Sequence, residues 1–338
     1  MPPRAHVGVM KLPRPDRFSL SLIAAALLGS ALPASGEPKD VLAVVTQIGV
    51  GLVFFLHGAN LSREAVLAGM TRWKLHLLIL VLTFVAFPLA GLGVGLLAPT
   101  LITPALAAGV LFLCCVPSTV QASVALTGMA GGNVPAAVCS ASASNLIGVV
   151  LTPALIAVLM QTQGFSLNLD IVRGIVLQLL LPFLAGQLLR PRIAPFIARH
   201  KKVLQLADRG SILLIVYGAF GAAMLQGLWQ QVSTADLTIL FLTVVALLGL
   251  VLSGAKLASR ALGFDRADMI TATFCGSTKS LATGIPLANI LFAGQAIGMI
   301  VLPLMLFHQM QLITCSYVAQ RYARRREAET LAAAAGAD

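Results

Sequence analysis

The stretch TFCGSTKSLATGIP, residues 273–286, places a lysine, Lys279, in the middle of a long apolar region. A charged side chain at the centre of a membrane span costs about 2.5–3.5 kcal/mol on insertion scales. Just before the lysine, Gly276 and two hydroxyl residues interrupt the run of good helix formers. If the flanking sequence crosses a membrane, this stretch predicts a broken helix that carries a functional charge.

The whole chain has the composition of a membrane protein. Of its 338 residues, 58% are hydrophobic and 10% are charged, and the mean hydropathy is +0.93. A soluble domain carries about 25% charged residues. Apolar runs long enough to cross a hydrocarbon core of about 30 Å recur along the sequence. We predict an all-α integral membrane protein with ten transmembrane helices, at residues 17–34, 41–58, 73–98, 103–129, 133–160, 170–190, 209–229, 236–262, 267–292 and 297–321.

The basic residues predict the orientation of these spans. The net charge of +11 does not indicate a nucleic-acid partner, because the lysines and arginines lie in alternating connections rather than on one face. With a cytoplasmic N-terminus, 20 of the 23 fall inside, before span one and after spans two, six, eight and ten. Lys39 and Arg173 are outside, and Lys279 is within the membrane. Both termini are therefore predicted to be cytoplasmic.

Two pairs of similar strings predict an internal repeat. LVFFLHGA (52–59) resembles ILLIVYGA (212–219), and CCVPSTVQAS (114–123) resembles TFCGSTKSLA (273–282), at offsets of 160 and 159. Because the repeated unit has five spans, the second copy enters the membrane inverted, as in many secondary transporters. The predicted segments are a cytoplasmic N-terminal segment (1–16), a first five-helix repeat (17–160), a second, inverted five-helix repeat (170–322) and a cytoplasmic tail (323–338).

The first span also has a second interpretation. Arg14 and Arg17 precede the apolar run FSLSLIAAALLGSALPA (18–34), which ends in small residues. This pattern is typical of a cleaved signal peptide. Cleavage would leave the first repeat one helix short, and we therefore expect a retained span.

Spans four and nine each contain a predicted break. From Leu106 to Cys115 is about 15 Å of helix, half the hydrocarbon thickness, before Pro117 interrupts the hydrogen-bond ladder. We predict interruptions near Val116–Ser118 and Gly276–Thr278 that lie close together at the midplane. Freed backbone groups and half-helix ends there can hold ions or anionic groups. The alternative is a proline kink and a glycine packing contact, without a binding role.

The polar residues at membrane depth define the candidate site. All twelve acidic residues fall in loops, tails or span ends, which leaves Lys279 as the only charged residue at that depth. The alternative for Lys279 is a purely structural bond to helix-terminal carbonyls, and His308 has the alternative of a buried neutral histidine. No catalytic residue, metal ligand or cofactor is predicted. The predicted substrate- or ion-binding residues are Ser118, Thr119, Gln121, Ser140, Ser144, Asn145, Ser277, Thr278, Lys279, Ser280, His308 and Gln309.

These same segments resemble a known family. STVQASVALTGMAGGNVPAAVCSASASN (118–145), FCGSTKSLATGIPLANILFAG (274–294) and VLPLMLFHQMQL (301–312) are similar to the bile acid:sodium symporter superfamily, in its bacterial SBF-like branch. The resemblance implies ten helices in two groups, a panel of spans one, two, six and seven and a core of the rest. It also implies that spans four and nine are broken where they cross, and that the protein lies in the bacterial inner membrane.

The sequence departs from the sodium-coupled members of that superfamily. Phe274 occupies the position where those members carry a glutamate at the crossing. Ala137 and Ala141 occupy the positions of two hydroxyl ligands of sodium. The resemblance therefore implies a transporter in which conventional sodium coupling is not expected.

We predict a secondary transporter that moves a small organic, anionic solute by alternating access, with the lipid bilayer as its surroundings and its oligomeric state left open. One alternative is an intramembrane hydrolase with Ser277 or Ser280 as nucleophile and Lys279 as base. Residues one or two apart on a helix do not face each other, which argues against it. A membrane regulator without transport activity is the other alternative.

The predicted orientation can be tested by cysteine accessibility. In a variant without native cysteines, Gly164→Cys should react with a membrane-impermeant reagent added outside, because the connection between spans five and six is external. His200→Cys should be protected, because the connection between spans six and seven is cytoplasmic. Labelling of His200→Cys from outside would contradict the ten-span arrangement.

Overall fold

The computed structural model describes residues 17–60, 72–160, 169–227, 230, 232–293 and 297–335. Within these residues every long element is a helix and no strand is present, which confirms the all-α prediction. The helices, with π-helical segments labelled η, are α1 (Arg17–Ala31), α2 (Glu37–Asn60), α4 (Trp73–Val81), η2 (Leu82–Ala86), α5 (Phe87–Leu101), α6 (Pro104–Cys115), α7 (Val120–Ala130), α8 (Val134–Leu159), α9 (Leu169–Gly174), η4 (Ile175–Leu180), α10 (Leu181–Arg199), α11 (Lys201–Leu225), α12 (Thr234–Ala261), α13 (Arg266–Ser277), α14 (Leu281–Leu291) and α15 (Ile297–Ala335).

Most, but not all, of the predicted spans have the length of a membrane helix. Among the described residues seven helices are long and apolar enough, and an eighth span results if α6 and α7, which meet at 60°, count as one. The other two predicted spans correspond to α1, with 15 residues, and to α13 with α14, of 12 and 11 residues. At about 1.5 Å per residue α1 reaches about 22 Å, less than the core thickness of about 30 Å. Ten spans therefore stay a prediction.

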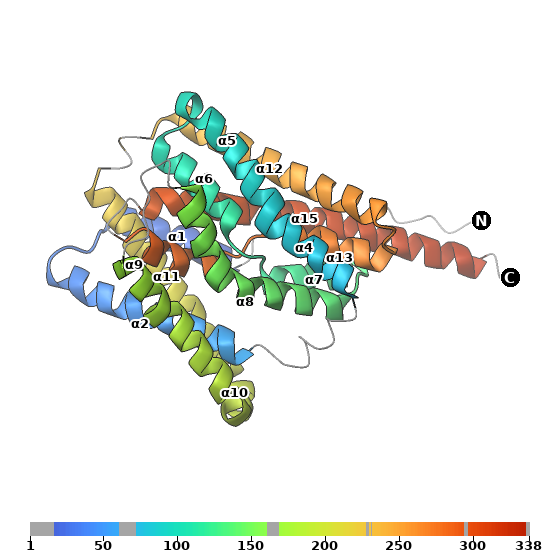
Figure 1. Cartoon of the computed structure of the whole chain (residues 1–338), viewed down its shortest axis with the longest axis horizontal. Helices are drawn as coiled ribbons and strands as arrows, with labels where there is room; N and C mark the ends of the chain where they lie inside the picture. Colours follow the sequence, from blue (N-terminus) through green and yellow to red (C-terminus); the bar gives the residue numbers. More distant parts are fainter. Residues whose placement is uncertain are drawn as a thin grey trace, which may run out of the picture.

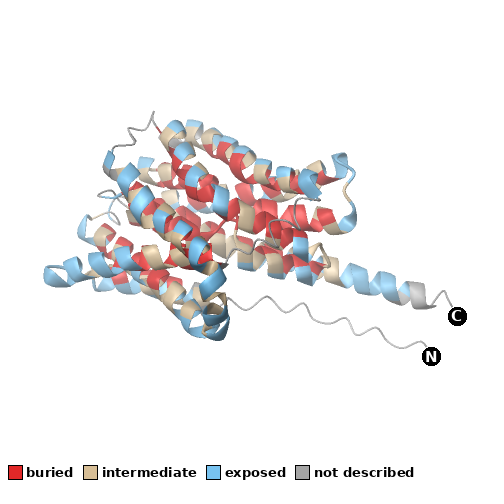
Figure 2. Cartoon of the chain, turned by 60° about the horizontal axis from the view of Figure 1, so that its bottom comes forward, coloured by how far each residue is buried: buried red, intermediate tan, exposed pale blue. Residues whose placement is uncertain are grey.

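The helices pack in two groups (Figure 1). In the first, which we call the panel, α2 packs on α10 and α11, and α1 packs on α11. In the second, the core group, α15 packs on α6, α7 and α12, while α13 contacts α7, α8 and α12. Contacts between the groups run from α11 to α14 and α15. Figure 2 shows the buried residues between the helices and the exposed end of α15 projecting past the bundle.

The two predicted interruptions are confirmed. α6 ends at Cys115 and α7 begins at Val120, while α13 ends at Ser277 and α14 begins at Leu281. The two breaks are in direct contact, because the Ser280 N–H donates to the carbonyl of Pro117 at 2.8 Å. Residues more than 150 positions apart in the sequence thus meet at one crossing.

The connection between spans six and seven differs from the prediction. We expected residues 191–208 to be a cytoplasmic connection, but α10 continues to Arg199, and α11 begins at Lys201 after a turn at His200. Hydrocarbon thickness limits only the apolar part of a helix, and long basic side chains are good helix formers outside it. The polar sequence therefore marked the end of the apolar run rather than the end of the helix. The reporter position Gly164 lies outside the described residues.

Glycines allow the close contact between α2 and α10. A Cβ added at Gly58 would lie 2.0 Å from the carbonyl oxygen of Phe183, and one at Gly186 would lie 2.1 Å from that of Phe55. Backbone atoms cannot move aside as flexible side chains do. Only glycine at these positions lets the two helices approach to this distance.

This contact predicts the effect of adding one methyl group. Gly58→Ala should lower the stability of the protein by roughly 1–3 kcal/mol, as for other overpacked sites. The control is Gly254→Ala on α12, where an added Cβ meets no atom within 4 Å. Thermal unfolding in detergent measures both variants. Equal midpoints for the two would contradict the close contact between α2 and α10.

Candidate functional site

The break between α6 and α7 exposes five consecutive carbonyl groups, those of residues 114–118, and all five are hydrogen-bonded. Buried carbonyls without partners would each cost free energy comparable to a lost hydrogen bond. The donors come from α8 and from the break between α13 and α14, so the first break is tied to both of these neighbours. In order they are Lys279 Nζ to Cys114 (2.8 Å), Thr152 Oγ1 to Cys115 (2.8 Å), Lys279 Nζ to Val116 (2.8 Å), Ser280 N to Pro117 (2.8 Å) and Asn145 Nδ2 to Ser118 (2.7 Å).

The Lys279 ammonium is enclosed completely. Its side chain is fully buried, and its third donated bond goes to the carbonyl of Thr83 at 2.9 Å. The Nζ atom also lies 4.1 Å from the centre of the Phe87 ring, a cation–π contact. An ammonium has three N–H donors, and all three are used. Two of the three acceptors, the carbonyls of Cys114 and Val116, belong to the α6–α7 break, which is the kind of contact given above as the structural alternative for Lys279. A binding role of the lysine stays a prediction.

The Thr83 carbonyl is available because of a π-helical segment. The Phe87 N–H donates to Leu82 rather than to Thr83, as the register of η2 requires. Pro88, the next residue that could reach Thr83 in this register, has no N–H. The motif TFVAFP (83–88) thus leaves one carbonyl without a helical donor, and Lys279 supplies the missing bond. The sequence did not lead us to predict this free carbonyl, although a proline five residues after Thr83, Pro88, is consistent with it.

The second break is held by Gln311 of α15. Its side-chain Oε1 accepts from the Lys279 backbone N–H at 2.7 Å, and its Nε2 donates to the Lys279 carbonyl at 3.0 Å. One buried amide therefore satisfies both backbone groups of the lysine. Nε2 also lies 2.9 Å from Nδ1 of His308. Gln311 thus clamps the crossing, although only its neighbours His308 and Gln309 were among the predicted site residues.

Hydroxyl groups join the two breaks directly. Ser118 Oγ donates to the Cys275 carbonyl at 2.6 Å and lies 3.1 Å from Thr278 Oγ1. The Thr278 hydroxyl is also 2.6 Å from Ser123 Oγ. All of these side chains are buried. The crossing is therefore a continuous polar network inside an apolar core, which favours one defined geometry.

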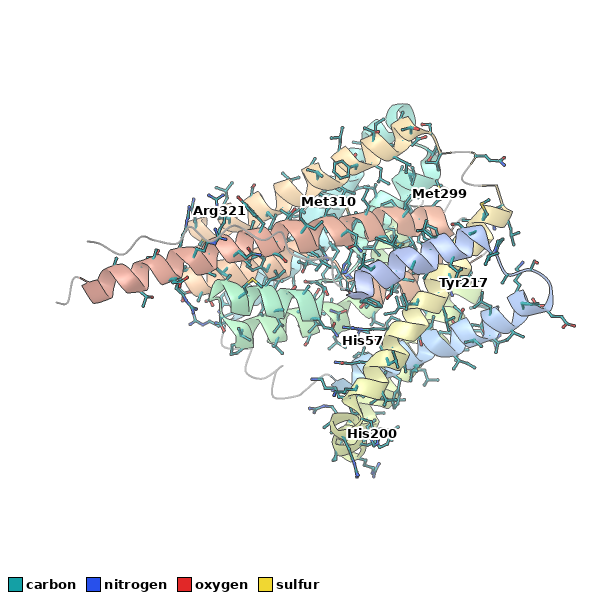
Figure 3. All side chains as sticks on the ribbon, turned by 180° about the vertical axis from the view of Figure 1, so that it is seen from behind. His57, His200, Tyr217, Met299, Met310 and Arg321 are labelled. Carbon is teal, nitrogen blue, oxygen red and sulfur yellow. The ribbon has the colours of Figure 1, made fainter. Side chains whose placement is uncertain are left out.

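A cavity of about 390 Å³ lies beside the crossing, between panel and core. The core contributes the starts of two half-helices, Thr119 to Gln121 at α7 and Ser280 to Thr283 at α14, together with Asn145 of α8. The panel contributes apolar side chains and the charged or ionisable residues His57, Lys201, Asp208 and Arg209. Figure 3 shows His57 on α2 where the panel faces the half-helices.

The polar groups of this cavity favour a negatively charged ligand. Helix N-termini carry partial positive charge and free N–H donors, and two of them open here. The α7 start has no side-chain cap, whereas Ser280 caps α14 by accepting from the Thr283 N–H. Lys201 and Arg209 add positive charge, opposed by the single carboxylate of Asp208 among the lining residues. The Oδ1 atom of that carboxylate is buried without a hydrogen-bond partner in the described structure.

A second cavity, of about 850 Å³, lies at the other end of the same helices. On α2 it is lined by residues from Lys39 to Gln47, whereas the first cavity meets α2 at Phe54 to His57. On α14 it is lined by Asn289 to Leu291, whereas the first meets Ser280 to Thr283. The two cavities thus lie at different positions along the same helices, and the first of them meets the crossing at Thr119 and Ser280.

The predicted site residues fall into three groups. Four line the first cavity: Thr119, Gln121, Asn145 and Ser280. Four belong to the crossing network: Ser118, Ser144, Thr278 and Lys279. Four lie elsewhere: Ser140, 2.6 Å from His76 Nδ1; Ser277, which donates to the Thr273 carbonyl; His308, beside Gln311; and the half-exposed Gln309. Of the panel side chains of the cavity, none was among the predicted site residues.

Broken helices that meet beside a cavity are typical of secondary transporters. The chain belongs to the SBF-like CPA transporter family, whose profile matches residues 16–324. It is 54% identical over 321 residues to "Uncharacterized protein PA2026" of Pseudomonas aeruginosa, with coverage of 94% of this chain and 96% of that protein. It is 47% identical over 312 residues to "Putative symporter YfeH" of Escherichia coli, covering 92% and 94%. It is 30% identical over 294 residues to "Sodium/bile acid cotransporter 7" of Rattus norvegicus, covering 86% of each. The resemblance to the bile acid:sodium symporter superfamily is confirmed.

The Gln311 clamp predicts a large loss of stability. Gln311→Leu removes both partners of the Lys279 backbone, and each stranded buried group costs about 1–3 kcal/mol. Gln309→Leu is the control, because Gln309 is on the same helix but half-exposed. Thermal unfolding should show a much lower midpoint for Gln311→Leu than for Gln309→Leu. Similar midpoints would mean that the clamp does not hold the crossing.

Proposed function

We propose that the protein is a secondary transporter of a small organic anion that works without sodium coupling. The observation that carries this proposal is the Lys279 ammonium, bound to the carbonyls of Thr83, Cys114 and Val116. Carbonyl oxygens at a helix break are also ligands for a sodium ion in transporters. Lys279 supplies a covalently attached cation in such a position, and a sodium ion within a few ångströms of it would be repelled.

The surroundings of the lysine support the same proposal. Phe274, where the sodium-coupled relatives of the superfamily carry a glutamate, is fully buried. Ala137 and Ala141, in the positions of two hydroxyl ligands, are also fully buried. None of the three offers an oxygen to a metal ion from its side chain. The buried charge here is positive, with no carboxylate among its hydrogen-bonding partners.

The substrate site is proposed to be the cavity of about 390 Å³ beside the crossing. A carboxylate or other anionic group would accept from the α7 N-terminus near Thr119 and from Gln121. Its apolar part would contact Phe54 and Phe183 of the panel. In this conformation Lys279 is not among the lining residues. The lysine therefore acts on the substrate through the position of the half-helices and not by direct contact.

Alternating access is supported by the two cavities at opposite ends of α2, α11 and α14. Movement of the panel relative to the core would close one cavity and open the other around the fixed crossing. On the basic-residue distribution the first cavity faces the cytoplasm of a bacterial inner membrane, since it is lined by Lys201 and Arg209. The proposed conformation is therefore inward-facing.

The hydrolase alternative finds no support in the site. The Ser277 hydroxyl donates to the Thr273 carbonyl, and that of Ser280 is hydrogen-bonded to Thr283. Lys279 Nζ uses all its donors on carbonyls. A nucleophile and its base should be within hydrogen-bond reach of each other. Here neither serine hydroxyl is a partner of the lysine.

Transport measurements test the proposal. A thermal-shift screen of organic anions on the purified protein identifies a ligand, and counterflow in liposomes measures its transport. Uptake should be equal in sodium and choline, because Lys279 already provides the cation. Lys279→Met should abolish uptake and lower the unfolding midpoint, because it strands the carbonyls of Thr83, Cys114 and Val116, while the protein still inserts in the membrane. Lys202→Met, at an exposed position, should transport normally. Uptake that falls in choline, together with normal activity of Lys279→Met, would overturn the proposal.

A further inference from the structure

A small basic cleft lies on the core group, and none of its lining residues lines either of the two larger cavities. It has a volume of about 210 Å³ and is formed between α12 and α15. Figure 3 shows Arg321 on α15 next to α12. The lining residues are Lys256, Tyr317, Val318, Arg321, Tyr322 and Arg325. Three cations and two tyrosines therefore share one opening, and no carboxylate lines it.

The three cations of this cleft have no ion-pair partner among the described residues. Glu329, one turn after Arg325 on α15, is already paired with Arg266. Arg321 lies 5.8 Å from the centre of the Tyr317 ring, so an aromatic face supports its guanidinium. Like charges held together without counter-charge repel each other, and a bound anion would relieve that repulsion.

The depth of the cleft matches the headgroup region of a bilayer. At about 1.5 Å per residue, Lys256 is about 33 Å along α12 from Thr234, just beyond a hydrocarbon core of about 30 Å. By the same count Tyr317 is about 30 Å and Arg321 about 36 Å along α15 from Ile297. Tyrosine at the boundary with basic residues just outside is the arrangement expected at a membrane interface.

Exposed apolar residues lie near the cleft on both of its helices. Leu257, adjacent to Lys256, is 63% exposed, and Leu250 is 60% exposed about two turns earlier on α12. Ile313, one turn before Tyr317, is 45% exposed on α15. A ligand with a charged head and an apolar chain can lie along this surface, its phosphate among the cations and its chain against the leucines. Free phosphate has no apolar chain, so it would contact the cations but not the exposed leucines.

We propose that this cleft binds the phosphate of an anionic phospholipid. Basic pockets between transmembrane helices at the cytoplasmic surface are known to suit such headgroups. A zwitterionic headgroup fits less well, because its own ammonium would face three cations. Lys256 and Arg321 belong to different helices, so the lipid would join α12 to α15 as a bridge. The proposal requires only that the protein lies in a bilayer, and it does not depend on the substrate or on sodium.

The test uses the full-length protein, delipidated in detergent and titrated with phosphatidylglycerol. Native mass spectrometry counts the retained lipids, and thermal unfolding reports their effect on stability. We expect one tightly retained phosphatidylglycerol and a raised unfolding midpoint. The triple variant Lys256→Gln, Arg321→Gln, Arg325→Gln should bind it on the order of 100-fold more weakly, since each cation near the surface contributes several-fold.

A matched control separates a specific site from general attraction. Arg192→Gln, Lys202→Gln, Arg324→Gln removes the same charge at exposed positions outside the cleft and should bind like the wild type. Equal weakening in this control would overturn the proposal. So would equal binding of phosphatidylcholine, or an equal stabilisation by inorganic phosphate alone. If the cleft variant unfolds at a low temperature without lipid, a triple variant that keeps the charges is tested for binding instead. This variant is Lys256→Arg, Arg321→Lys, Arg325→Lys. Retained binding supports the site, and lost binding rejects it.

Discussion

One buried ammonium holds this structure together. Lys279 donates to carbonyls of η2 and of the break after α6, while its own backbone is held by Gln311 of α15. Removing an ammonium from water is expensive, and it persists only where its hydrogen bonds are replaced. Here every donor has an oxygen at 2.8–2.9 Å. The cost of burial therefore favours one geometry of the crossing, because any shift would leave a charged donor or a carbonyl unpaired.

The rigid crossing explains how the site divides between the two groups of helices. The half-helix starts at Thr119 and Ser280 belong to the core and are fixed by the network around Lys279. His57 and Arg209 belong to the panel, whose contacts with the core run mainly from α11 to α14 and α15. On the proposed mechanism the core offers an unchanging anion site, and the panel supplies charges whose distance from that site changes with conformation. On this mechanism the fixed helix dipoles of the core bind the anion, and movement of the panel charges opens or closes the path to it.

The sequence predicted those parts of the site whose physical signals are local. Pro117 and Gly276 marked the breaks, and the cost of a buried charge singled out Lys279. The acceptor of its third bond was not predicted, because a carbonyl freed by a π-helical register leaves only a proline as its trace. Asp208 was assigned to a polar connection and Arg209 to the first position of span seven, because α11 begins well before its apolar run. Contacts between panel and core depend on packing over long sequence separations, which no local pattern encodes.

The two predicted repeats differ at one position of the crossing, because only the second carries a lysine there. At the offset of 159, Lys279 corresponds to Val120, so the first repeat carries no second lysine. A single ammonium reaches carbonyls of Cys114 and Val116 in that repeat, and a second cation nearby would add repulsion without new acceptors. Because the lysine is covalently attached, its charge cannot leave with the substrate. On the proposed mechanism, the lysine therefore does not neutralise the charge that the anion carries across the membrane. On the proposed mechanism any balancing ion would bind elsewhere, and Asp208 is the one carboxylate among the lining residues of the proposed substrate cavity.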